Sequence, residues 1–235
     1  MLRHDFRRRG QSEGVETDDR PVATGIPFPT EDRSLFDCDA CPNLGWKHPE
    51  IEAAINTALG LLRRLTAGVR EVSLQPISDT IAPNIVLAEN YAFHAPYFAK
   101  TPQLYHAAIR RNLQQGSEVS TAAYIQSRRE LDEARRAIGA VFSNVDLLVT
   151  PTTAVPPPAI EEAVRLGIEL ELIRNTAPFN TYGLPTISVP CGFTSSGLPI
   201  GIQISGPHFG ETKVLALAHA YEQATDWRTR RPHDF

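Results

Sequence analysis

Hydrophobic residues recur at helical spacing in four stretches of the chain. The clearest stretch begins at Pro49, which suits the first position of a helix because its missing N–H needs no partner there. Apolar side chains then follow every three or four residues as far as Leu62, and Gly68 is a stop signal. The same spacing predicts three further helices, over 84–99, 119–142 and 211–224.

Short apolar or β-branched runs between these helices predict strands. They cover 69–74, 146–149, 186–189 and 200–205. Pro190 closes the third strand, and the turn residues at 195–197 join it to the fourth, which indicates a hairpin. Because a helix leads directly into a strand, the pattern is typical of an α/β layer structure.

The hairpin has two different faces. In 200–205 the three isoleucines point to one face of the strand, whereas Gly201, Gln203 and Ser205 point to the other.

The earlier strand, 146–149, is apolar throughout and is followed by four prolines between 151 and 158. Such a stretch continues neither a helix nor a sheet interior. It is therefore expected to be a loop at a strand end, where α/β proteins commonly place binding groups.

Composition narrows the class of protein. Hydrophobic residues make up 42% of the chain and charged residues 21%, with a formal net charge of -4. These values fit a globular protein and offer no basic field for nucleic acid or anionic lipid. No apolar run approaches the roughly 20 residues of a membrane span. Residues 1–23 are charged and are expected to be a disordered leader, while 24–235 form the folded portion, with a cytoplasmic location.

Familiar metal and nucleophile motifs are absent. Cys38 and Cys41 form a lone CxxC with His48 as the only histidine close in sequence, whereas a structural zinc site needs four ligands. We interpret them as loop cysteines without a shared task, and we expect no metal site here. Neither a GxSxG nucleophile elbow nor a GxxxxGK or GxGxxG phosphate loop occurs.

The most specific signal lies between residues 175 and 203. Its elements are Asn180-x-x-Gly183-Leu184-Pro185, then Ile187-Ser188-Val189-Pro190-x-Gly192, then Gly197-Leu198-Pro199-x-Gly201-x-Gln203. Together with the upstream run at 146–152, these motifs resemble the C-terminal part of the amidase-signature family. The resemblance spans roughly residues 24–235. It implies an α/β/α fold in which helices flank a mixed central sheet.

The resemblance also implies a chemistry, cleavage of amide bonds by a Ser–cis-Ser–Lys arrangement without metal or nucleotide. The Gly/Ser-rich stretch that carries those serines has no match here, and the family's lysine also lies upstream. The three lysines, Lys47, Lys100 and Lys213, lack an apolar strand-like context. We therefore assign no catalytic residue by resemblance.

The loop before the Gly-Leu-Pro motif lies near the active site in this family, so the resemblance makes Asn175, Thr176 and Asn180 candidates for substrate binding. The alternative is that Asn180 and Thr181 only cap or turn the backbone. Gly183 and Gly201 are expected to serve backbone geometry or close packing.

The sequence therefore predicts an amidase-type hydrolase portion that lacks its catalytic stretch and is silent alone. Its expected partners are a small-molecule amide in the complete enzyme, and either a complementary N-terminal amidase chain or another copy of itself, because a missing half exposes sheet edges. Two alternatives are a non-catalytic binding or scaffold protein, and an active hydrolase with an unrecognised nucleophile, such as Cys191 or Ser188.

Overall fold

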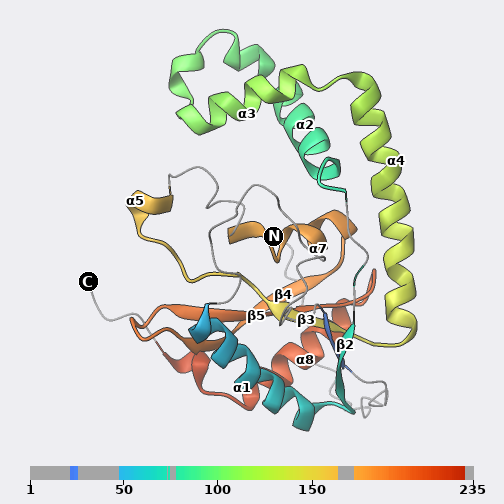
Figure 1. Ribbon diagram of the computed structural model, residues 1–235, viewed down its shortest axis with the longest axis vertical. Helices are drawn as coiled ribbons and strands as arrows, with labels where there is room; N and C mark the ends of the chain where they lie inside the picture. The colour runs from blue at the N-terminus through green and yellow to red at the C-terminus, as the bar shows by residue number, and fades with distance from the viewer. Residues whose placement is uncertain (1–21, 26–47, 73, 75–77, 164–171, 231–235) are drawn as a thin grey trace, which may run out of the picture.

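The computed structural model describes residues 22–25, 48–72, 74, 78–163 and 172–230 (Figure 1). The charged leader up to residue 21 and the two cysteines of the CxxC motif lie outside these ranges, as does Lys47. The boundary predicted at residue 23 falls within the first strand, which begins at Val22.

A five-stranded mixed sheet forms the centre of the molecule. Its order is β2 (Val69–Val72), β1 (Val22–Gly25), β3 (Leu148–Pro151), β5 (Pro199–Ser205) and β4 (Thr186–Phe193). The first strand runs parallel to both of its neighbours, whereas β5 is antiparallel to β3 and to β4. The mixed sheet expected from the family resemblance is thereby confirmed.

Two helices cover the lower face of this sheet in the view of Figure 1, namely α1 (Pro49–Leu65) and α8 (Glu211–Gln223). Their apolar sides meet the isoleucines of β5 in the main hydrophobic core. The fully buried members of this core include Ile55, Leu62, Ile202, Ile204 and Tyr221. The helical stripe beginning at Pro49 and the isoleucine face of the hairpin are therefore the two sides of one core.

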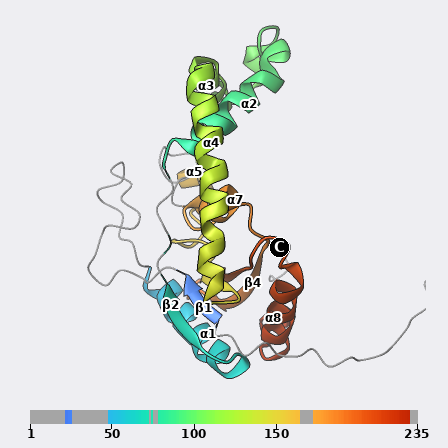
Figure 2. The same cartoon turned by 90° about the vertical axis from the view of Figure 1, so that its right-hand side faces the viewer.

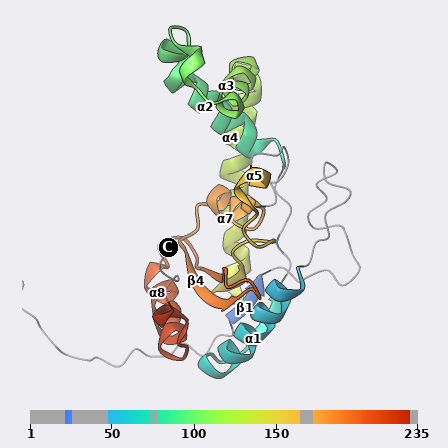
Figure 3. The same cartoon turned by 90° about the vertical axis from the view of Figure 1, so that its left-hand side faces the viewer.

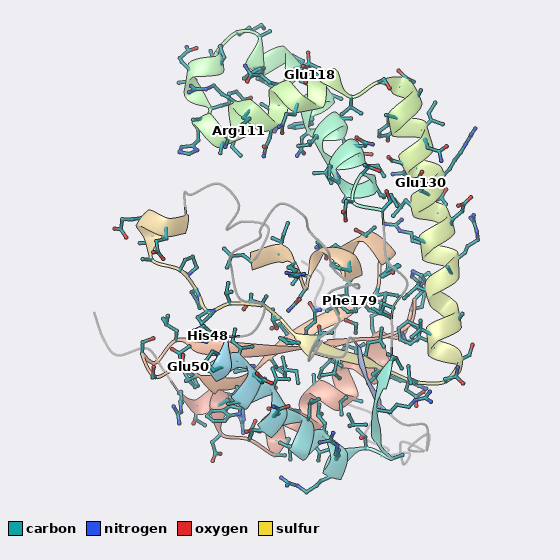
Figure 4. The ribbon with its side chains drawn as sticks, viewed as in Figure 1. His48, Glu50, Arg111, Glu118, Glu130 and Phe179 are labelled. Atoms are coloured by element: carbon teal, nitrogen blue, oxygen red, sulfur yellow. The ribbon has the colours of Figure 1, made fainter. Side chains whose placement is uncertain are left out.

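The upper face carries a second, smaller core. The short helix α7 (Ala177–Tyr182) lies above the strands, and Phe179 of this helix points toward the sheet (Figure 4). Phe179 is buried together with Tyr182, Leu184 and Leu148. The short helix α5 (Ile160–Ala163) precedes α7 in the chain, and the 3-10 turn η3 (Trp227–Thr229) follows α8.

Three helices form an arm that extends from the sheet to one end of the long axis, as Figures 2 and 3 show. They are α2 (Ile81–Phe98), α3 (Ala107–Glu118) and α4 (Thr121–Ala137). The 3-10 turn η1 (Pro102–Leu104) links the first two, and η2 (Ile138–Ser143) leads from the third toward β3. Helix α2 packs against both α3 and α4.

Most predicted elements are confirmed, but two predictions need correction, and β1, α3 and α7 were not predicted. The prediction for 186–189 ended at Pro190, whereas β4 continues through a bulge to Phe193. A proline is tolerated there because β4 is an edge strand of the described sheet. The predicted helix 119–142 is divided into α4 and η2.

No helix in the described part of the chain is long and apolar enough to cross a membrane.

Candidate functional site: the polar face of the sheet

Above the main core, strands β3, β5 and β4 present a face rich in hydroxyl and amide groups. Its middle row runs from Thr150 through Gln203 to Ser188, which are paired across the strands. The next row pairs Ser205 with Thr186, whose hydroxyl groups are hydrogen-bonded at 2.8 Å. The predicted division of strand 200–205 into an isoleucine face and a polar face is confirmed, because Ile202 and Ile204 belong to the lower core.

Gly201 brings two hydroxyl groups together on this face. Thr152 Oγ1 and Ser188 Oγ lie 2.6 Å apart above it. A Cβ atom at residue 201 would lie 2.7 Å from the first oxygen and 2.8 Å from the second. Any side chain here would therefore push the pair apart, which confirms the expected packing role of this glycine.

Gln203 connects the sheet to the loop that precedes α7. Its side chain is buried, and its Nε2 donates hydrogen bonds to Thr150 Oγ1 at 3.0 Å and to the Asn175 carbonyl at 3.1 Å. An amide with two such bonds is fixed in orientation, since a buried polar group without partners costs stability. The glutamine thus anchors the segment in which the predicted binding residues lie.

The three predicted binding residues have different surroundings. Asn175 is half-buried, and its carbonyl accepts the bond from Gln203. Thr176 is also half-buried, and its hydroxyl donates to the Ile173 carbonyl at 3.0 Å in a local turn. Asn180 is exposed on α7. The structure therefore brings the Asn175 carbonyl to the polar face, whereas the Thr176 hydroxyl bonds within a local turn. Thr181, which the alternative interpretation named, donates its hydroxyl to the Ala177 carbonyl at 2.9 Å, a local contact within α7.

The Gly-Leu-Pro motif forms the end of α7. Gly183 has a φ of 72°, a left-handed conformation that favours glycine. Its N–H and that of Leu184 return to the carbonyls of Asn180 and Phe179, at 3.1 Å in both cases. Leu184 then packs with Phe179 in the smaller core. The motif thus stops the helix and directs the chain into β4, as expected for Gly183.

Neither nucleophile considered from the sequence is activated. Cys191 is buried in the main core, and this burial raises the pKa of its thiol to about 12, so the thiolate form is scarce at neutral pH. Ser188 is exposed, but its hydroxyl is paired with the Thr152 hydroxyl, which is not a base. The hypothesis that either residue serves as nucleophile is therefore not supported.

The two described lysines have surface or structural positions. Lys100 is exposed just after α2, and Lys213 Nζ donates to Asp146 Oδ1 at 2.8 Å. Within the described ranges, no three His, Cys, Asp or Glu residues gather as they would around a metal ion. The accessible hydroxyls of this face, on Thr152 and Ser188, can donate and accept hydrogen bonds toward a polar ligand, whereas Thr150 and Gln203 are buried. The described residues supply no activated nucleophile for this face.

A contact with α1 positions the turn between β4 and β5. The carboxylate of Glu50, in the first turn of α1, accepts a hydrogen bond from the Ser195 N–H at 2.7 Å. Hydrogen bonds from the Ser195 side chain and backbone hold the pKa of Glu50 below its ordinary value of 4.5. Glu50 and His48 both lie at the start of α1 (Figure 4). The hairpin is thus held by α1 at its turn as well as along its apolar face.

Sequence comparisons identify relatives over most of the chain. A family model described as Amidase matches residues 42–215. An amidase of Pseudomonas putida is 32% identical over 194 residues, which cover 78% of this chain and 41% of that protein. A glutamyl-tRNA(Gln) amidotransferase subunit of Thiobacillus denitrificans is 30% identical over 212 residues, covering 78% of this chain and 43% of its own length. The chain therefore spans less than half the length of these relatives.

Solved structures share the fold. A crystal structure of an amidase superposes with a TM-score of 0.71 at 25% identity, over 87% of this chain and 46% of that one. A 6-aminohexanoate cyclic dimer hydrolase reaches a TM-score of 0.73 at 22% identity, over 92% of this chain and 47% of its own. The arrangement of mixed sheet and covering helices is thus one that an amidase structure contains. On the family match and these relatives, the chain belongs to the Amidase family.

Proposed function

We propose that this chain forms the C-terminal portion of an amide hydrolase, in which a separate N-terminal portion supplies the nucleophile and its base. Membership of the Amidase family and the chain's span of less than half of its relatives support this proposal. The observation that carries it is the polar face built by Gln203, Thr150 and the paired Thr152 and Ser188, which lacks an activated nucleophile of its own in the described residues.

Within this proposal the polar face helps to orient the amide substrate. Hydroxyl and amide groups can donate to the carbonyl oxygen of an amide and accept from its N–H. Asn175, Thr176 and Asn180 would line the same site from the loop above, with Asn180 the most accessible of the three. The buried Gln203 contributes by fixing the loop at Asn175, so that the loop loses little freedom when a ligand binds, which is an advantage in positioning a substrate.

The proposed partners follow from assigning the nucleophile to an N-terminal portion and substrate orientation to this chain. We propose a small-molecule amide as the substrate and a polypeptide with the N-terminal portion of an amidase as the macromolecular partner. Chemistry of this family uses neither metal nor nucleotide, so no cofactor is included. We also propose a cytoplasmic location, because three cysteines are too few for the disulfide framework of a secreted protein.

The test compares the chain alone with a chimera. In the chimera, this chain replaces the matched C-terminal part of the Pseudomonas putida amidase. Both proteins are treated with a fluorophosphonate serine probe, analysed by intact mass, and assayed for amide hydrolysis. We expect no adduct and no turnover from the chain alone, and a single adduct on the grafted N-terminal portion together with turnover from the chimera.

Two variants of the chimera test the binding site. Asn180→Ala removes the exposed amide of α7 and is expected to raise KM by roughly five- to tenfold, the effect of losing one hydrogen bond. Asn112→Ala makes the same change on an exposed position of α3 and is expected to leave KM unchanged. A folded but inactive chimera, or an adduct and turnover from the chain alone, would contradict the proposal.

A further inference from the structure

Helix α2 presents an apolar stripe that the rest of the described chain leaves exposed. Val86, Asn90, Phe93 and Tyr97 follow one another at intervals of four, three and four residues. This spacing places them on one face of the helix, in the pattern by which paired helices pack side by side. Val86 is 52% exposed, Phe93 72% and Tyr97 61%, and Asn90 is exposed as well. We call these four residues the α2 stripe.

The other faces of α2 already have partners. Ile81 and Ile85 pack with Leu131 of α4 in a small core. On the side of α3, a Cβ atom at Gly116 would clash with the Leu87 carbonyl and with Tyr91. The helix therefore builds the arm with two of its faces, and the third face, which carries the α2 stripe, is exposed among the described residues.

The stripe's chemistry suits another helix with the same surface. Glu89 is the only acidic residue in α2, which has neither lysine nor arginine, and Glu89 accepts a hydrogen bond from Tyr124 of α4. Two such stripes can therefore approach without repulsion between like charges. Among these apolar residues Asn90 occupies a central position, where a polar side chain fixes the register of two paired helices.

The position of the arm also favours a second copy. In all three views α2 and α3 lie beyond the sheet, at one end of the long axis (Figures 1–3). A second molecule can reach the stripe there without displacing the sheet or its covering helices. We propose that the α2 stripe is a self-association surface, on which α2 of a second copy of this chain packs across a two-fold axis. This inference is independent of the proposed enzymatic function.

The test measures the molecular mass of the full chain in solution by sedimentation equilibrium over a broad range of concentrations. We expect a reversible monomer–dimer equilibrium. Phe93→Glu places a carboxylate in the centre of each stripe and is expected to raise the dimer dissociation constant by at least about 30-fold, as for a central interface residue. The matched control is Leu215→Glu on α8, where Leu215 is 58% exposed. It is expected to leave the dissociation constant unchanged.

Circular dichroism and thermal unfolding of both variants check that the fold is intact, since both changes lie at exposed positions. Tyr97→Lys provides a second disruption of the stripe with the opposite charge, and it should also weaken the dimer. A chain that stays monomeric at every concentration would overturn the proposal. So would self-association that persists in both Phe93→Glu and Tyr97→Lys, or that Leu215→Glu abolishes to the same extent.

Discussion

The ion pair between Lys213 and Asp146 joins the first turn of α8 to the segment just before β3. Lys213 Nζ lies 2.8 Å from Asp146 Oδ1, with the aspartate side chain 9% exposed and the lysine side chain 42% exposed. The Lys213→Met change keeps most of the aliphatic stem and removes the ammonium. It leaves a largely buried carboxylate without this partner, which is the costly way to break an ion pair.

The geometry sets the size of the effect. At this separation the direct Coulomb attraction is about 6 kcal/mol for an effective dielectric constant of about 20. Desolvation of the buried carboxylate offsets much of this attraction, and water around the half-exposed lysine screens it further. We therefore expect Lys213→Met to lower the free energy of unfolding by about 2 kcal/mol, and the coupling energy of the pair to be about 1–2 kcal/mol.

The assay is a double-mutant cycle. Urea unfolding is measured for the parent chain, Lys213→Met, Asp146→Asn and the double variant. The comparison requires that the slope of unfolding free energy against urea concentration, the m-value, is the same in all four. The loss of unfolding free energy in the double variant is expected to be smaller than the sum of the losses in the two single variants. Lys100→Met, at an exposed position after α2, is the control and should change stability by less than about 0.5 kcal/mol. A coupling energy within error of zero would refute the reasoning.

Three further predictions concern single residues. Gly183→Ala forces a Cβ into a left-handed conformation and should lower the free energy of unfolding by about 1 kcal/mol, read by urea unfolding, whereas Gly183→Asn should lower it less. In a chain with Cys38 and Cys41 replaced by serine, Cys191 should react with iodoacetamide at neutral pH only as the protein unfolds; rapid labelling of the folded chain would contradict its burial. Glu50→Gln should destabilise the chain at neutral pH. Because the folded pKa of Glu50 is lowered, its contribution is present above 4.5 and is lost as the pH falls through the lowered value, so the parent and the variant should converge in acid melts.

The sequence predicts the layers of this fold well because the main core is built from strong patterns. The stripe that begins at Pro49 and the isoleucine alternation of 200–205 are each long enough to define a buried face. Both faces prove to lie in one core. The family motifs then indicate the mixed sheet, which hydrophobic pattern alone does not specify.

The elements that were missed have weak or misleading local signals. In α3, only two of the twelve residues, Ile109 and Leu113, are large and apolar. They lie four residues apart on one face, so the helical signal is real but too short to stand out in a polar sequence. Pro190 is a strong local stop signal, and only the position of β4 at the edge of the described sheet shows why the strand passes through it.

The candidate site depends on pairings that no local pattern contains. Gln203 bonds to a carbonyl 28 positions away, and Ser188 meets a hydroxyl 36 positions away. Alternation along 186–189 places Thr186 and Ser188 on one face, a usable signal that was not interpreted. The register that aligns Ser188 with Gln203 and Thr150 is set by the whole sheet, which explains why the polar face was predicted only along one strand.

The position of α1 beneath the hairpin has a consequence for synthesis on the ribosome. Glu50 contacts a residue 145 positions later, and Ile55 and Leu62 share their core with strands and a helix at the far end of the chain. The arm can assemble as soon as Ala137 has emerged, because its helices are neighbours in sequence. The apolar side of α1 instead remains incompletely covered until β4, β5 and α8 have been made. During that interval we expect α1 to be the segment of the nascent chain on which a chaperone acts.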